Sequence, residues 1–220
     1  MNVSPLLLEL RKNLPEVMAS VEVDVMKTFS ELCPNELPVE GALEIVKPIN
    51  KMAMKAKFRI GTKCAHSEKA EWRTEKNEEI GQSRDNPQSP HKWKMHGVPG
   101  TMGFEMLDGM PEPTEYDYFV WKGMETELHP YGACYHDPLN KISTGLIEWL
   151  LINDVTTVVV SGLAFDYCVK TTALELAETG LFKVVLIKEC TRGINPNGYD
   201  AVEKELTDNG VKILDTVEEL

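Results

Sequence analysis

The sequence predicts an α/β domain in which a mostly parallel, six-stranded sheet carries helices on both faces. Two observations support this prediction. Short runs rich in β-branched residues alternate along the chain with segments of helical periodicity. The run VTTVVVSG at 155–162 is almost continuously apolar, as expected of a strand covered on both faces. Such alternation is typical of βαβ units, in which a helix joins two parallel strands.

The strands are predicted where apolar or alternating runs are bounded by turn residues. They are SVEVDV at 20–25, KFRIGT at 57–62, YDYFVWKG at 116–123, VTTVVVSG at 155–162, FKVVLIKE at 182–189 and VKILDT at 211–216.

The helices are predicted from apolar residues spaced three and four apart. They are 41–56, with Pro48 as an irregularity, then 143–154, 166–180 and 199–210, the last two closed by glycine. The first 17 residues form an amphipathic helix rather than a secretory signal, because charges soon interrupt the apolar patch. We expect residues 1–220 to form one domain with a long loop insertion at about 63–113, within which the charged segment 67–92 is a candidate lid.

Composition narrows the classes of function. The net charge of −12 argues against nucleic-acid and acidic-membrane partners, both of which require a basic surface. No apolar run reaches the roughly 20 residues that span a bilayer. The five cysteines form an odd set without a CxxC pair, so a reducing, cytoplasmic location is expected instead of a disulfide framework.

Three reactive side chains stand at the predicted carboxyl ends of strands, where open α/β sheets bind their ligands: Asp24, Lys122 and Cys168. A thiol at a helix start can be activated as a nucleophile, a carboxylate can carry its proton, and an ammonium can hold the anions. The set predicts acyl transfer on an amide. Taken singly, each residue also has an ordinary interpretation: a packed thiol, a capping aspartate and a solvated lysine.

The motifs around these residues resemble the isochorismatase-like cysteine hydrolases, and nicotinamidases in particular. SGLAFDYCVKTTAL at 161–174 is similar to their nucleophile signature, EVDVMKTF at 22–29 to their aspartate segment, and VWKG at 120–123 to their lysine segment. YGACYHD at 131–137 and KECTRGI at 188–194 follow in the family order. The resemblance covers about residues 18–215.

The resemblance implies a Rossmann-like, three-layer α/β/α sandwich and a catalytic triad of Asp24, Lys122 and Cys168 that works through a thioester. It also implies a cis peptide between Leu163 and Ala164. The N–H groups of Ala164 and Cys168 would then form the oxyanion hole.

Further members of the site follow from the same resemblance. Phe29, Trp93 and Leu163 would contact the substrate ring. The activity implied is hydrolysis of nicotinamide, a small-molecule amide, to nicotinate and ammonia. Assembly into homo-oligomers is common in the family, and the sequence leaves it open.

A divalent metal, zinc above all, is the cofactor that the resemblance implies. Its ligands would be Cys64, His66 and His96, with Cys64 standing where the family has an aspartate. Zinc accepts thiolate and imidazole readily, and residues two apart on an extended segment share a side. His91 is the alternative to His96.

The departures from the family pattern keep two other functions open. Met26, Thr28, Cys64 and Ala65 replace a glutamine, two aspartates and a tryptophan of the family. A metal-free amidase that acts on another small amide would use the same triad. A catalytically silent member with a binding role would retain the fold alone.

Overall fold

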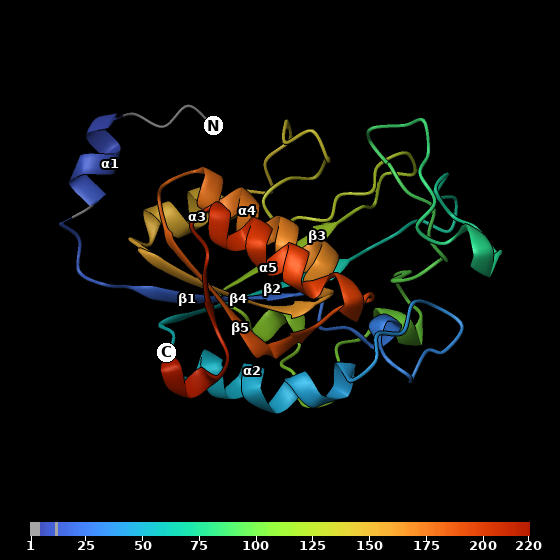
Figure 1. Cartoon of the computed structure of the whole chain (residues 1–220), viewed down its shortest axis with the longest axis horizontal. Helices are drawn as coiled ribbons and strands as arrows, with labels where there is room; N and C mark the ends of the chain where they lie inside the picture. The colour runs from blue at the N-terminus through green and yellow to red at the C-terminus, as the bar shows by residue number, and fades with distance from the viewer. Residues whose placement is uncertain (1–4, 12) are drawn as a thin grey trace.

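A six-stranded sheet, in which every neighbouring pair of strands is parallel, forms the centre of the computed structural model (Figure 1). Residues 5–11 and 13–220 are described. The strand order is β3-β2-β1-β4-β5-β6. The strands are β1 (Met18–Val23), β2 (Phe58–Cys64), β3 (Tyr118–Lys122), β4 (Thr157–Leu163), β5 (Lys183–Arg192) and β6 (Lys212–Leu214). The predicted sheet is confirmed, and it is wholly rather than mostly parallel.

Helices cover both faces of the sheet, as predicted. Figure 1 shows α2 on one face and α3, α4 and α5 on the other. The helices are α1 (Pro5–Arg11), α2 (Val46–Ala53), α3 (Leu146–Ile152), α4 (Lys170–Glu178) and α5 (Tyr199–Asp208). The N-terminal helix predicted over the first 17 residues is seen only at α1, because residues 13–17 are not helical, and positions 1–4 and 12 lie outside the described residues. No helix in the described part of the chain is long and apolar enough to cross a membrane.

Two helix predictions need correction. Residues 41–56 are not one helix, since a 3₁₀ turn at Ala42–Ile45 precedes α2, and Pro48 falls in the first turn of α2. A proline is tolerated there because the first N–H groups of a helix have no partner within it. Residues 166–180 likewise divide into a π-helical turn, Phe165–Val169, and then α4.

The strand order places the carboxyl ends of β1 and β4 side by side at the middle of the sheet. From β1 the chain moves outward through β2 and β3, and β4 then returns to the other side of β1. This reversal is the point at which open parallel sheets bind ligands. The long connections also gather at this edge (Figure 1).

The connection 65–117 is folded onto this edge, although its sequence is rich in charge. It holds short 3₁₀ turns and isolated bridges rather than longer elements. Trp72 and Trp93 are buried within it, and the backbone N–H of Trp93 donates to the backbone carbonyl of Trp72 at 3.2 Å. The segment 67–92 therefore packs through Trp72 and a few small residues, while most of its charged side chains remain exposed to solvent.

A buried carboxyl group fixes the loop 131–137 to α4. Glu175 accepts a hydrogen bond from the Cys134 N–H at 3.0 Å. Burial raises the pKa of Glu175 to about 7, and the bond from Cys134 opposes the shift. Between pH 4.5 and about 7 the folded chain keeps a proton that the unfolded chain releases. The free energy of unfolding therefore falls as the pH rises through this window.

Replacing Glu175 with glutamine should remove this pH dependence, because the amide oxygen still accepts the Cys134 N–H and carries no proton. Relative to wild type, the free energy of unfolding of the variant should rise by on the order of 3 kcal/mol between pH 4 and pH 8. Urea titrations at several pH values measure it. The control is Glu178→Gln, an exposed position of the same helix. Parallel pH profiles for wild type and Glu175→Gln would refute the assignment.

Candidate active site

Asp24 lies immediately after β1 and is fully buried. Its φ of 49° is left-handed, an uncommon conformation for a residue with a side chain. Thr62 fixes it on both sides: the Asp24 N–H donates to Thr62 Oγ1 at 3.1 Å, and the Thr62 hydroxyl donates to Asp24 Oδ1 at 2.6 Å. The second carboxylate oxygen, Oδ2, is left to face the neighbouring strand ends.

Gly162 allows β4 to pass this close to β1. It has a φ of +107°, and a Cβ there would lie 2.0 Å from the carbonyl oxygen of Val23. A side chain at 162 would therefore separate the two central strands beside Asp24.

Lys122, at the end of β3, is buried and uses its ammonium to join three acceptors. Its Nζ lies 2.8 Å from Asp24 Oδ2, 3.3 Å from Cys64 Sγ and 3.5 Å from Cys168 Sγ. Burial by itself lowers the pKa of Lys122. Electrostatic attraction to Asp24 and to the sulfurs of Cys168 and Cys64 outweighs the effect of burial, so the pKa of Lys122 stands well above its usual value. The ammonium is therefore a fixed cation at the centre of the cluster.

Cys168 lies in the π-helical turn between β4 and α4, where its sulfur reaches Lys122. The Leu163–Ala164 peptide that precedes the turn is cis, as the resemblance implied. The Thr172 hydroxyl donates to the Cys168 carbonyl oxygen at 2.7 Å, which anchors the turn to α4. The structure thus brings Asp24, Lys122 and Cys168 together from three strand ends.

A small pocket, mostly apolar, opens on Cys168. Its aromatic lining comprises Phe29, Trp93, His96, His129, Tyr131 and Tyr167. Ala164 belongs to the lining, whereas Leu163 is fully buried and does not. The Trp93 ring meets Tyr167 edge-on at 4.9 Å and donates its N–H to the Tyr131 hydroxyl at 3.0 Å. The cavity itself is only about 20 Å³, so a flat aromatic ring could enter only if these side chains moved apart, and it would then meet the faces and edges of other rings.

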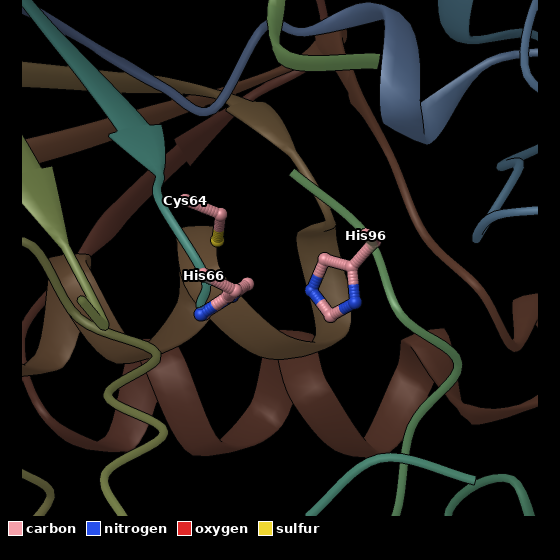
Figure 2. Close-up of side chains that lie close together, drawn as sticks. All are labelled: Cys64, His66 and His96. Carbon is pink, nitrogen blue, oxygen red and sulfur yellow. The ribbon is translucent and has the colours of Figure 1, made fainter. Parts of the chain in front are cut away.

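Three potential metal ligands gather beside this pocket. Figure 2 shows the Cys64 sulfur and the rings of His66 and His96 facing a common space. Their ligand atoms all lie within 4.8 Å of one another. His91 is not part of this cluster: its Nδ1 is 3.0 Å from the Tyr131 hydroxyl. The structure therefore favours His96 over the alternative.

The two histidines are oriented as metal ligands usually are. His66 donates from Nδ1 to the Gly123 carbonyl at 3.1 Å, and His96 donates from Nδ1 to the Lys94 carbonyl at 2.7 Å. Each Nε2 then carries a lone pair, and that of His66 is buried without a partner. Burial lowers the pKa of His96 to about 4 and that of His66 well below its usual value. Neutral imidazoles with free lone pairs fit a zinc ion.

Cys64 belongs to the metal-ligand cluster and to the triad at once. Its thiol donates to Asp24 Oδ2 at 3.3 Å and accepts from Lys122. A hydrogen bond with Cys168, burial and the charge of Asp24 raise its pKa well above the usual value. The Cys64 sulfur therefore holds its proton more tightly than an ordinary thiol, and a metal ion would have to displace that proton to bind there.

Sequence reasoning missed several residues of the site, above all His129 and Trp72. The His129 ring stacks on His66 with centroids 4.9 Å apart, and both of its nitrogens are buried without a hydrogen-bond partner among residues 5–11 and 13–220. Trp72 is fully buried and contacts both histidines edge-on. Tyr131 stood in the quoted YGACYHD motif and Tyr167 beside the nucleophile, so a local signal existed for those two alone.

A profile of the isochorismatase domain matches residues 18–218, which is most of the chain. The protein belongs to the isochorismatase domain family.

Within that family, the chain is similar to nicotinamidases. It is 30% identical over 135 residues to the nicotinamidase of Saccharomyces cerevisiae, a match that covers 60% of this chain and 62% of that protein, less than two thirds of its length. The nicotinamidase of Acinetobacter baylyi is 29% identical over 196 residues, which cover 87% of this chain and 89% of that one.

Solved structures of nicotinamidases and of a pyrazinamidase superpose on this chain. The nicotinamidase and pyrazinamidase of Acinetobacter baumanii superposes with a TM-score of 0.82 at 26% identity, over 94% of this chain and 100% of that one. The pyrazinamidase of Pyrococcus horikoshii in complex with zinc gives a TM-score of 0.70 at 25% identity, over 91% and 99%. A yeast nicotinamidase bound to nicotinaldehyde shares the fold, with a TM-score of 0.79 at 23% identity, over 91% and 100%.

Proposed function

We propose that the protein is a nicotinamidase-type amidohydrolase, which converts nicotinamide and water to nicotinate and ammonia. The observation that carries the proposal is the buried cluster of Asp24, Lys122 and Cys168 at the mouth of an aromatic pocket. Its nicotinamidase relatives support the same substrate class. Membership of a hydrolase family alone would leave the substrate open.

The reaction follows from the partners of each side chain. Cys168 Sγ attacks the amide carbonyl, and the N–H groups of Ala164 and Cys168 hold the oxyanion. Asp24, within 4.8 Å of the sulfur, takes the thiol proton and gives it to the leaving amine, so ammonia departs and a thioester remains. Water, deprotonated by the same carboxylate, cleaves the thioester to the acid and restores the thiol. Lys122 holds Asp24 and the sulfur in place throughout.

Cys64, His66 and His96 would hold a divalent metal, and their donor set fits zinc. When bound, zinc supplies a Lewis acid beside the pocket that suits the ring nitrogen of a pyridine. Phe29 and Trp93 would hold the ring between aromatic walls.

Replacing Gly123 with alanine should weaken this metal site. A Cβ at 123 would lie 2.5 Å from His66 Cε1 and 2.6 Å from His66 Nδ1, so the ring must move away from its carbonyl partner. Loss of such a supporting contact typically lowers metal affinity by about 10–100-fold. Titration of zinc against a competing chromophoric chelator measures the affinity.

Gly81→Ala is the matched control. Gly81 has a φ of +78°, close to the +86° of Gly123, but a Cβ there meets no atom within 4 Å. It reproduces the backbone cost of the substitution without the clash. Equal zinc affinities for the two variants would rule out the positioning role of Gly123.

Release of ammonia from nicotinamide, with zinc supplied, tests the proposed activity. Benzamide, which has the same amide without the ring nitrogen, is the matched substrate, and we expect it to be turned over far more slowly. A purified, folded protein that releases no ammonia from nicotinamide would refute the proposal.

A second candidate is a metal-free amidase for another small amide, and the contacts of Cys64 favour it. The thiol is already paired with Asp24 and Lys122, so this cluster is satisfied without a cation. Metal analysis separates the candidates. Zinc below roughly 0.1 equivalents per chain after zinc-replete expression would favour the metal-free enzyme.

A further inference from the structure

The catalytic cluster holds a second sulfur that the hydrolytic reaction does not need. Lys122 Nζ contacts Cys64 Sγ at 3.3 Å and Cys168 Sγ at 3.5 Å, and both sulfurs lie within 4.8 Å of one another. A disulfide bond is about 2.05 Å long. A bond between them therefore requires the two sulfurs to approach each other from their separation in this structure.

The two cysteines come from strands that are not neighbours. Cys64 ends β2 and Cys168 follows β4, with β1 between them. Their meeting therefore depends on both side chains reaching inward to the same ammonium.

We propose that Cys168 and Cys64 form an oxidative modification site, in which a hydroperoxide oxidises Cys168 and Cys64 converts the product to a reversible disulfide. The inference goes beyond the amidase activity and does not depend on it, because it concerns the two sulfurs alone.

The first step takes place at Cys168, which lines the pocket. Asp24 takes the thiol proton as the sulfur, held beside the Lys122 ammonium, attacks one oxygen of the hydroperoxide. The sulfur–oxygen bond forms, the oxygen–oxygen bond breaks, and the departing hydroxide or alkoxide takes that proton from Asp24 and leaves as water or an alcohol. Cys168 is now a sulfenic acid, two electrons more oxidised, and the hydroperoxide is the oxidant.

The second step depends on the contact between Cys64 and Asp24. The Cys64 thiol donates to Asp24 Oδ2 at 3.3 Å, so the carboxylate can accept its proton when the sulfur attacks. Cys64 Sγ bonds to the sulfenic sulfur, the sulfur–oxygen bond breaks, and the departing hydroxide takes the proton from Asp24 as water. Without Cys64, the sulfenic acid would stay exposed to further peroxide and pass to the irreversible sulfinic acid.

The test is peptide mass spectrometry of the full-length protein after hydrogen peroxide treatment, with EDTA present so that no metal holds Cys64. We expect one linked peptide pair, Cys64 to Cys168, which dithiothreitol separates. After reduction, iodoacetamide should label at least about tenfold more Cys168 in wild type than in Cys64→Ser, where Cys168 should be sulfinic or sulfonic acid. Cys33→Ser, which alters a cysteine outside both clusters, should behave as wild type.

Absence of the linked peptide from oxidised wild type would overturn the proposal. Equal recovery of Cys168 thiol in wild type and Cys64→Ser would also overturn it. If Cys64→Ser does not fold, the wild-type peptide map decides the question alone. The readout is a covalent bond rather than turnover, so failure here leaves the amidase proposal untouched.

Discussion

Replacing Cys168 with alanine should abolish ammonia release from nicotinamide, with a fall in kcat of at least about 10⁴-fold. The Cys168 sulfur lines the pocket, contacts Lys122 and stands beside the Ala164 and Cys168 N–H groups that would hold the oxyanion. The fold should survive, because the Lys122 ammonium keeps Asp24 and Cys64 as acceptors. Steady-state kinetics and thermal unfolding measure the two effects.

Cys33→Ser is the control for general loss of a cysteine, and it should keep wild-type turnover. Cys168→Ala protein that releases ammonia at a rate near that of wild type would show that another group is the nucleophile. Iodoacetamide adds an independent check in wild type. A Cys168 that is labelled no faster than a free peptide thiol would favour a catalytically silent protein.

Replacing Asp24 with asparagine should reduce both turnover and stability. The asparagine oxygen can still accept the Thr62 hydroxyl, but the side chain no longer carries the negative charge that faces Lys122. Loss of the proton carrier should lower kcat by about 10²–10⁴-fold. An uncompensated buried ammonium should cost about 3–5 kcal/mol of folding free energy. Ammonia release and urea unfolding report the two losses separately.

The double variant Asp24→Asn/Lys122→Met separates charge balance from catalysis. It removes the uncompensated cation together with its partner, so stability should recover relative to Asp24→Asn. Turnover should not recover, since both catalytic groups are gone. Asp24→Asn protein with wild-type kcat would refute the proton-transfer role, and unchanged stability would refute the charge pairing.

The fold was largely predictable because each strand has a clear local pattern. The apolar run of β4 and the glycines that close α4 and α5 are visible in the sequence. The irregularities of the helices were harder to predict. Pro48 is compatible with the start of a helix as well as with its interruption, and the π-helical turn at 165–169 has no periodicity of its own.

From position in the chain alone, the site was predictable only where side chains follow strand ends, whereas Cys64, His66 and His96 were placed by the family resemblance. Asp24, Lys122 and Cys168 could be placed from the strand ends. For Lys122 the local sequence alone would predict a solvated lysine, but the side chain is fully buried. His129 and Trp72 could not. They lie in connections without a helical or strand period, and the ring contacts that place His129 against His66 and Trp72 join segments more than 50 residues apart.

Carbon-13 NMR of nicotinaldehyde, labelled at its aldehyde carbon, shows whether the Cys168 sulfur attacks a nicotinoyl carbonyl held in this pocket. With wild-type protein the aldehyde signal should move to the thiohemiacetal region, and with Cys168→Ala it should stay in the carbonyl region. A saturating titration that leaves the wild-type signal in the carbonyl region would contradict the account, as would the same shift with Cys168→Ala.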